Sequence, residues 1–175
     1  MGYILFMSGS PGERDGQSVL PGGRRAALPR IAGVKILELG NVLTRSGWMM
    51  ELFRQDWNGI KIAAQQINWV ELSPNGVTDW HRHASQTDHL VGVGGVIKLA
   101  LWDGRADSPN QQTEVIRLGA LHPVMVIVPA GVWHALRNES GIPAGYINVV
   151  DRLYDHEHPD NWRLTPGMAE IPNIL

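Results

Sequence analysis

Cysteine is absent from this chain of 175 residues. Disulfide bonds, thiolate zinc sites and a cysteine nucleophile are therefore excluded, and the composition suits a reducing cytoplasm, where we expect the protein. No apolar run approaches the roughly 20 residues of a transmembrane helix. The formal net charge is only -2, so electrostatics favour neither nucleic acid nor an anionic membrane as a partner. No glycine motif between a strand and a helix indicates a dinucleotide site.

Long helical periodicity is also almost absent, and short apolar runs take its place. These runs are separated by Gly, Pro, Asn and Asp, a pattern typical of an all-β domain. The predicted strands cover 34–39, 60–72, 89–93, 96–102, 115–118, 123–128, 132–136 and 145–150. Residues 48–57 fit a short helix or a strand equally well. Eight or more short strands favour a sandwich or barrel that closes its edges, such as a jelly roll.

The length and the 43% hydrophobic content favour one domain with a real core. We expect this domain to span residues 31–175. Residues 8–30 are rich in Ser, Gly, Pro and Arg and show little periodicity, so we interpret 1–30 as a flexible extension or as a strand that needs a partner. Pairing of such a strand with a neighbouring subunit would shield an open sheet edge, so we expect a homodimer.

The most informative stretch is His81-Arg82-His83, which is followed by Asp88. On a β-strand, side chains at positions i and i+2 point to the same face, so both rings are expected on one side of the sheet. A distant segment, residues 129–134, ends in a third histidine. Its proline and glycine mark a tight entry to a strand, which would set the ring of His134 inward.

Three imidazoles and one carboxylate that converge inside an all-β domain can do two different jobs. They can hold a divalent metal such as Fe, Mn, Ni or Zn, leaving one or two positions open for chemistry. They can also move protons. The residue types alone leave both possibilities open.

The two segments resemble the two motifs of the cupin superfamily. In the match to the first motif, His81-x-His83 is followed after four residues by the acid Asp88, and after six more residues by Gly95. The second is matched by Pro129-x-Gly131-x-x-His134-x-x-x-Asn138. In the first motif, Asp88 stands where cupins usually carry glutamate. This resemblance implies an all-β cupin jelly roll, a double-stranded β-helix.

Within the cupins, residues from about Leu43 to Leu164 resemble the dTDP-4-dehydrorhamnose 3,5-epimerase family of nucleotide-sugar isomerases. The matching segments are Ser46–Phe53, Gln66, Trp80-His81, Gln86–Val91, Gly95–Arg105, Ser108-Pro109 and Val128–His134. The resemblance implies an epimerase or isomerase that acts on a dTDP-4-keto-6-deoxyhexose in polysaccharide or secondary-metabolite biosynthesis.

The chemistry of that family assigns roles to particular positions. A base removes a hydrogen next to a keto group, a donor or cation steadies the enolate oxygen, and an acid returns the proton on the opposite face without a cofactor. By resemblance, His81 is the base and Tyr146 is the nearest candidate for the acid. A one-residue shift on its strand would point Tyr146 outward. The residues expected to contact the substrate are Glu51, Gln66, Arg82 and His134.

Three departures from the family pattern keep other functions open. Asp88 replaces the lysine expected to steady the enolate, and Thr78 and Ser46 replace two arginines that suit a diphosphate. These changes favour a first alternative, a metal-dependent cupin enzyme whose ligands are His81, His83, Asp88 and His134. A second alternative is a sugar-binding member that has lost catalysis.

Two further expectations concern the surroundings of the site. The carboxylate that pairs with the base is expected to be Asp151, Asp155 or Asp160. His89 alternates away from Asp88 along the strand and is expected at the surface.

Overall fold

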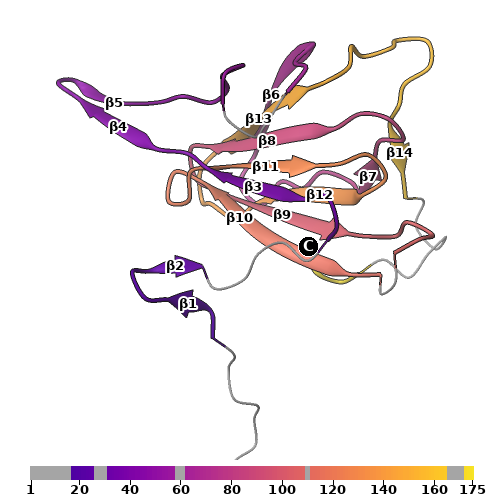
Figure 1. The fold of residues 1–175 in the computed structure, drawn as a ribbon, viewed down its shortest axis with the longest axis horizontal. Helices are drawn as coiled ribbons and strands as arrows, with labels where there is room; N and C mark the ends of the chain where they lie inside the picture. Colours follow the sequence, from indigo (N-terminus) through magenta and orange to yellow (C-terminus); the bar gives the residue numbers. More distant parts are fainter. Residues whose placement is uncertain (1–16, 26–30, 58–61, 109–110, 165–171) are drawn as a thin grey trace, which may run out of the picture.

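The computed structural model describes residues 17–25, 31–57, 62–108, 111–164 and 172–175 (Figure 1). In these ranges every regular element is a β-strand, so the predicted all-β class is confirmed. The same ranges contain no helix long and apolar enough to cross a membrane.

Most strands belong to two five-stranded antiparallel sheets. The first sheet has the order β10 (Thr113–Gly119), β9 (Val96–Trp102), β12 (Trp133–Asn138), β7 (His81–Arg82), β14 (Trp162–Arg163). The second has the order β3 (Lys35–Glu38), β11 (Val124–Val128), β8 (Asp88–Val93), β13 (Ala144–Val150), β6 (Gln66–Leu72). Consecutive strands repeatedly fall in opposite sheets, and the result is the predicted jelly roll.

The main core lies between the two sheets because their strands alternate inward and outward side chains. On β8, Leu90 points inward and is 1% exposed, and on β12, Leu136 points inward and is fully buried. Their neighbours Val91 and Ala135 point outward yet are also buried, in two separate outer clusters. Both sheets are therefore covered on their outer faces.

Different parts of the chain provide these two covers. Segment 37–57, together with Ile62 and Ala64, packs on the outer face of the second sheet. Leu164 and the terminal Ile174 and Leu175 pack on the outer face of the first sheet against a tryptophan-rich cluster. The central strands are consequently buried on both faces. This explains why their sequences are nearly continuous apolar runs.

Most predicted strands are confirmed, with shifted ends. The hairpin formed by 89–93 and 96–102 is present as β8 and β9. The long strand predicted from residue 60 begins only at Gln66, and its first two residues lie outside the described ranges. The alternative of a helix over 48–57 is wrong, since Gly47–Met50 forms β5 and no helix follows it.

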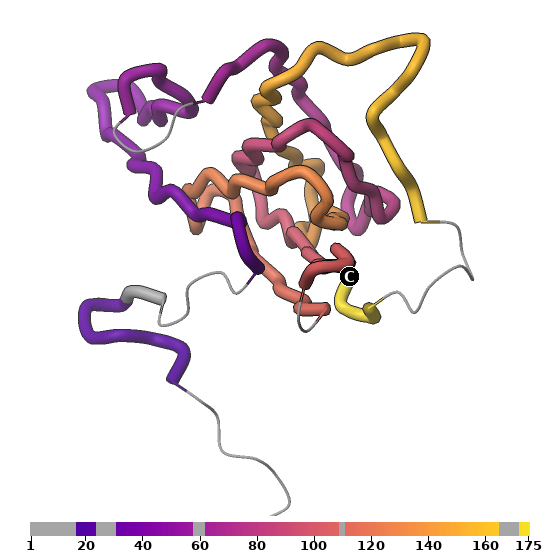
Figure 2. The backbone as a smooth tube through the Cα atoms, turned by 45° about the vertical axis from the view of Figure 1, so that its right-hand side comes forward, coloured from indigo at the N-terminus to yellow at the C-terminus, as the bar shows by residue number. Residues whose placement is uncertain are grey.

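Two short hairpins lie outside the large sheets. One is β1 (Val19–Leu20) with β2 (Arg24–Arg25), in the part of the predicted N-terminal extension that the structure describes. Residues 1–16 and 26–30 of that extension lie outside the described ranges. The other is β4 (Asn41–Thr44) with β5, which we call the arm; it projects from the barrel at the end of β3 (Figures 1 and 2).

Asn138 fastens the end of β12 to the neighbouring turns. Its side-chain amide donates to the carbonyls of Leu72, Ser73 and Ile142 at 2.8–3.2 Å, and its oxygen accepts from the amide of Ser140 at 2.8 Å. The side chain is fully buried. The asparagine of the second motif is therefore a structural residue, which satisfies backbone groups that have no strand partner.

We expect Asn138→Ala to lower the free energy of unfolding by roughly 2–4 kcal/mol, because it removes the hydrogen bonds that a fully buried side chain makes to four backbone groups. Asn173→Ala, at an exposed position outside the sheets, is the matched control and should change this free energy by less than about 0.5 kcal/mol. Urea unfolding followed by circular dichroism measures both. Equal effects of the two substitutions would contradict this role of Asn138.

Candidate functional site

The three histidines of the two motifs meet on the inner face of the first sheet. β7 and β12 are neighbouring antiparallel strands, and His81 lies directly opposite His134 in their register. The centroids of these two rings are 4.2 Å apart. His83 follows β7 and faces the same way, with its ring centroid 5.7 Å from that of His81 and 5.8 Å from that of His134.

The turn before β12 fixes the second motif to the first. Gly131 has φ +85, a left-handed conformation that favours glycine. Its amide donates to the carbonyl of His83 at 2.7 Å. The predicted tight entry is confirmed, and it ties the strand of His134 to the end of the His81–His83 stretch.

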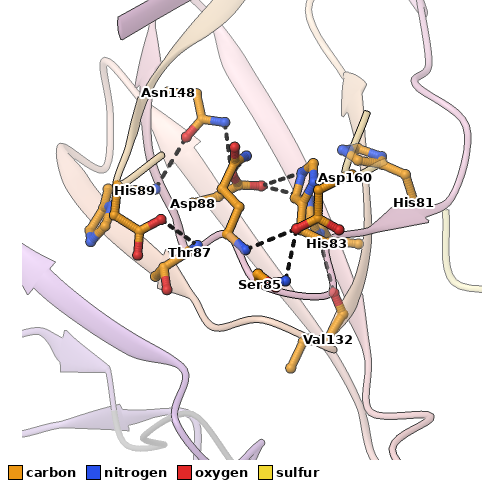
Figure 3. Close-up of polar contacts among 12 residues, drawn as sticks. His81, His83, Ser85, Thr87, Asp88, His89, Val132, Asn148 and Asp160 are labelled. Carbon is orange, nitrogen blue, oxygen red and sulfur yellow. Dashed lines mark hydrogen bonds and ion pairs between the residues drawn. The ribbon is translucent and has the colours of Figure 1, made fainter. Parts of the chain in front are cut away.

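Asp88 reaches the histidines from the opposite sheet, at the start of β8. Its Oδ2 lies 3.3 Å from Nε2 of His83 and 3.0 Å from Nε2 of His134. Its Oδ1 accepts hydrogen bonds from the side-chain amides of Gln86 at 2.7 Å and Asn148 at 3.1 Å (Figure 3). One oxygen is thus held by amides, and the other is aimed at two imidazoles.

The other nitrogen of each imidazole contacts a backbone carbonyl. Nδ1 of His81 is 2.8 Å from the carbonyl of Asp79, and Nδ1 of His134 is 3.1 Å from that of Val132. Nδ1 of His83 contacts the carbonyl of Asp160. A carbonyl oxygen only accepts, so Nδ1 must carry the hydrogen in all three rings. In a neutral ring the lone pair is then on Nε2, the atom that faces the centre.

Burial and mutual contacts shift the pKa values of these groups in opposite directions. Burial, aided by the nearby His134, lowers the pKa of His81 to about 3. Burial also opposes the charge on His83, but Asp88 and the carbonyl of Asp160 outweigh it and raise its pKa. Burial disfavours ionisation of Asp88, yet His134 and His83 hold its pKa well below the usual range. The carboxylate is therefore ionised at neutral pH, and His81 is uncharged.

A cleft of about 720 Å³ opens onto this centre. His81 and His83 line it, whereas Asp88 and His134 are each 1% exposed and lie behind them. The rest of the lining is mostly polar and comes from β6, β13 and the segment between β13 and β14, shown yellow-orange in Figure 2. A ligand in the cleft would meet the rings of His81 and His83 first.

No carboxylate among the three expected candidates pairs with His81 in the described part of the chain. Asp160 instead accepts from the backbone amides of residues 84–86 at 2.7–3.2 Å. Asp151 accepts from the amide of Thr87, and Asp155 accepts from amides in its own turn. Asp160 and Asp151 thus hold the loop after β7, and the contact described for Nδ1 of His81 is the carbonyl of Asp79.

Of two other predicted residues, Gln66 lines the cleft, whereas Tyr146 lies in the core and is not among the residues that line the cleft. Tyr146 points inward, on the same face of β13 as Asn148, and packs in the main core. Burial, with a smaller effect of Asp88, raises its pKa to about 12, so the phenol keeps its proton. Gln66 lines the cleft, where its oxygen accepts from the amide of Tyr154 at 3.0 Å.

Two predicted substrate contacts lie elsewhere in this chain. The guanidinium of Arg82 is 5.2 Å from the ring centroids of both Trp133 and Trp162, on the other side of β7 from the centre. Glu51 is exposed beyond the arm and forms an ion pair with Arg54 at 3.1 Å. Neither residue lines the cleft within the single chain.

The expectation that His89 lies at the surface is wrong. The residue is 4% exposed, and its Nδ1 is 2.7 Å from the carbonyl of Val149. It does point away from Asp88, as the alternation requires. The outer face it points to is covered by the segment around the arm, which the strand pattern alone could not reveal.

Sequence reasoning missed two residues at the site. Asn148 orients Asp88, and it could have been found from its position two residues after Tyr146 on the same strand. Arg152 lines the cleft, with its Nε donating to the carbonyl of Ser85 at 2.9 Å. It lies in a loop without periodicity, so no sequence pattern pointed to it.

The fold and the site together define a cupin whose inward histidines open onto a polar cleft. No family model matches the sequence. The chain is 31% identical over 139 residues to the "Probable low-salt glycan biosynthesis epimerase Agl13" of Haloferax volcanii, covering 78% of this chain and 89% of the relative. The chain therefore belongs to the family of this glycan biosynthesis epimerase.

Solved structures agree with this fold. A dTDP sugar isomerase from Desulfovibrio desulfuricans superposes with a TM-score of 0.72 at 23% identity, over 79% of this chain and 87% of that one. The dTDP-6-deoxy-D-glucose-3,5-epimerase RmlC from Legionella pneumophila, solved with dTDP-4-keto-L-rhamnose, superposes with a TM-score of 0.68 at 19% identity, over 78% and 75%. The predicted cupin jelly roll is thus confirmed.

Proposed function

We propose that this chain is an epimerase or isomerase of a dTDP-linked 4-keto-6-deoxyhexose, with a role in the biosynthesis of a cytoplasmic precursor of a surface polysaccharide or related glycan. The proposal is supported by the family membership and by a cleft lined by His81, the residue to which the resemblance assigns the role of base. The cleft volume of about 720 Å³ falls in the range of sites for ligands of this size.

The proposed reaction removes a hydrogen from the carbon next to the keto group and returns one on the opposite face. Nε2 of His81 has its lone pair directed to the site and takes the proton. Its weak basicity, with a backbone carbonyl in place of a carboxylate partner, predicts slow turnover. Tyr146 keeps its proton at neutral pH and is the candidate acid. The reaction as such requires no cofactor.

The diphosphate of such a substrate needs a cation, and Arg152 is the candidate. Two arginines expected from the family pattern are replaced by Thr78 and Ser46. Arg152 lies in the cleft. Among the contacts described, only its Nε donates a hydrogen bond, to the carbonyl of Ser85. Its terminal nitrogens are suited to the paired hydrogen bonds that phosphate accepts from arginine.

The first prediction concerns exchange of solvent hydrogen. The intact protein should incorporate deuterium from D₂O into dTDP-4-keto-6-deoxyglucose, detected by mass spectrometry, and His81→Gln should slow incorporation by roughly 10²–10⁴-fold. Tyr146→Phe should retain incorporation but lose the inverted product. His122→Ala, at a turn beside Glu38, is the control and should behave like the natural sequence. No incorporation by the intact protein would refute the proposal.

The second prediction concerns the diphosphate. Arg152→Ala should raise KM for the nucleotide sugar by about 10-fold or more with a small change in kcat, since a remote charge contact contributes to binding in both ground and transition state. Arg117→Ala, whose guanidinium lies 2.7 Å from Glu139, is the matched control, in which an arginine is removed outside the cleft. A KM equal to that of the control would exclude Arg152 as the diphosphate contact.

The arm supports the proposal that the protein is a homodimer. Four of its apolar side chains, Val42, Leu43, Trp48 and Met49, are between 51% and 86% exposed. An isolated two-stranded hairpin is marginal in water, and a cluster of exposed apolar residues is typical of an interface. A second copy of the chain would cover them.

Light scattering during gel filtration tests the dimer. The natural sequence should elute at twice the chain mass of 19.3 kDa, and Leu43→Glu should shift the population to the monomer because it buries a charge at the interface. Leu121→Glu, at a turn where the side chain is 88% exposed, should remain a dimer. A monomeric natural protein would overturn the proposal.

A further inference from the structure

We propose that Arg82 positions the base His81 from the opposite face of the same strand, by the stacking of its guanidinium between two indoles. This role rests on the proposed function, because it takes His81 to be the base. Arg82 is not among the described residues that line the cleft. It is therefore a positioning residue, which acts on the reaction through His81 and touches no reacting atom.

The strand that carries the base is short. β7 consists of His81 and Arg82 alone. Its register with β12 has a single pair of opposite residues, His81 and His134, whereas β12 pairs with β9 along its whole length. The position of the His81 ring therefore depends on more than the pairing of β7 with β12.

The inner face of β7 offers little that would hold the ring of His81. Its Nδ1 contacts the carbonyl of Asp79, which lies only two residues earlier in the same segment and moves with it. The ring of His134 is close, with 4.2 Å between the centroids, but its Nε2 has no hydrogen-bond partner in the described chain. With the hydrogen on Nδ1 of both rings, neither Nε2 can donate to the other.

The outer face of the first sheet supplies a restraint that the inner face lacks. Arg82 and Trp162 are opposite each other in the register of β7 and β14, and Trp133 begins β12 on the other side of β7. The guanidinium carbon of Arg82 is 5.2 Å from the ring centroid of each indole. This distance is within the range of cation–π contacts, for which tryptophan is the strongest aromatic partner.

The row of planar groups continues onto a fourth strand. Trp133 lies opposite Trp102 of β9 in register, and the two indoles stack with centroids 6.4 Å apart and planes at 23°. Trp102 is only 9% exposed, whereas Trp162 on the edge strand is 54% exposed. The outer stack, which we define as Trp102, Trp133, Arg82 and Trp162, thus joins β7 and β14 to the buried part of the sheet.

The guanidinium of Arg82 is committed to the indoles. Within the described residues it forms no ion pair, unlike Arg117 on the same face of the sheet, whose guanidinium is 2.7 Å from Glu139. A planar guanidinium can stack on aromatic faces, whereas the ammonium of lysine is a point charge. Arg82 is therefore suited to clamp β7 between β12 and β14.

The outer stack fixes the base because neighbouring residues of a strand point to opposite faces. Any shift of the Arg82 backbone displaces His81, the preceding residue, on the side of the cleft. A misplacement of about 1 Å can slow a catalysed reaction by roughly 100-fold. Trp162 also lines the cleft, so the outer stack ties the base to one wall of the site.

Deuterium exchange into dTDP-4-keto-6-deoxyglucose measures the effect on the base. Arg82→Leu should lower kcat for exchange by about 10–100-fold and change KM by less than about 2-fold, because the guanidinium lies outside the cleft. Arg82→Lys keeps a cation between the indoles and should recover most of the rate. Arg117→Leu, on the same face of the sheet, is the matched control and should exchange like the natural sequence. Equal rates for Arg82→Leu and this control would overturn the positioning role.

NMR spectra of the ring nitrogens measure the placement of His81 without turnover. In protein labelled with ¹⁵N-histidine, the signal lost in His81→Gln identifies this ring, which should carry its hydrogen on Nδ1. Arg82→Leu should give a mixture of both tautomers at His81, whereas His122, held by the carbonyl of Arg117, should keep one. An arginine that only stabilised the fold would leave both rings unchanged. A single, natural tautomer of His81 in folded Arg82→Leu would contradict the positioning role.

Trp162→Leu provides a second test if Arg82→Leu fails to fold. The indole is 54% exposed, so its removal opens one side of the outer stack without a cavity in the core. Mixed tautomers of His81 are expected here too, and an unchanged ring would count against the clamp. Where both single variants fold, as judged by circular dichroism, their losses in kcat should not multiply in the double variant, because they remove the same contact. Multiplied losses would show that the two residues act separately and would overturn the clamp.

Failure of this role is distinguishable from failure of the proposed function. Absence of exchange by the natural protein would refute the epimerase proposal, and the ring spectra would still decide whether Arg82 holds His81. Exchange by the natural protein, with unchanged ring spectra in Arg82→Leu, would overturn the positioning role alone.

Discussion

The contact between Asp88 and the histidines of the opposite sheet is the interaction on which the site depends. Asp88 begins β8 in the second sheet, whereas His81 and His134 face each other on β7 and β12 of the first. The carboxylate is buried, ionised and held by two amides, so it fixes where the imidazole nitrogens can point. A charged group in such a place is costly unless it is matched by positive charge. The histidines are brought close to Asp88 by the two sheets, by the turn at Gly131 and by the loop whose amides donate to Asp160.

This arrangement differs from the proton-transfer site that the sequence resemblance leads us to expect. A base is most effective when a carboxylate stands behind it, and His81 has a backbone carbonyl there. The acid that the chain does have lies in front of the rings, on the side of Nε2. The resemblance leads us to expect a lysine at this position. With Asp88 in its place the charge there is negative, and the carboxylate lies in front of the imidazole rings and not behind them. The same fold can carry different chemistry because function resides in the site.

Much of the fold and the centre of the site could be predicted from local rules. The spacing of His81 and His83 predicts a shared face, and the proline–glycine turn predicts the inward direction of His134, because both rest on backbone geometry. The carbonyl contacts could not be predicted, since every residue has a carbonyl and that of Asp160 lies 77 positions from His83. The burial of His89 was missed for a similar reason: the cover comes from a segment distant in sequence.

The most direct test of this account is a high-resolution crystal structure of the natural protein at neutral pH. We predict that Oδ2 of Asp88 lies close to Nε2 of both His83 and His134, at about 3.3 and 3.0 Å. A carboxylate of Asp88 that is turned away from both rings would contradict it.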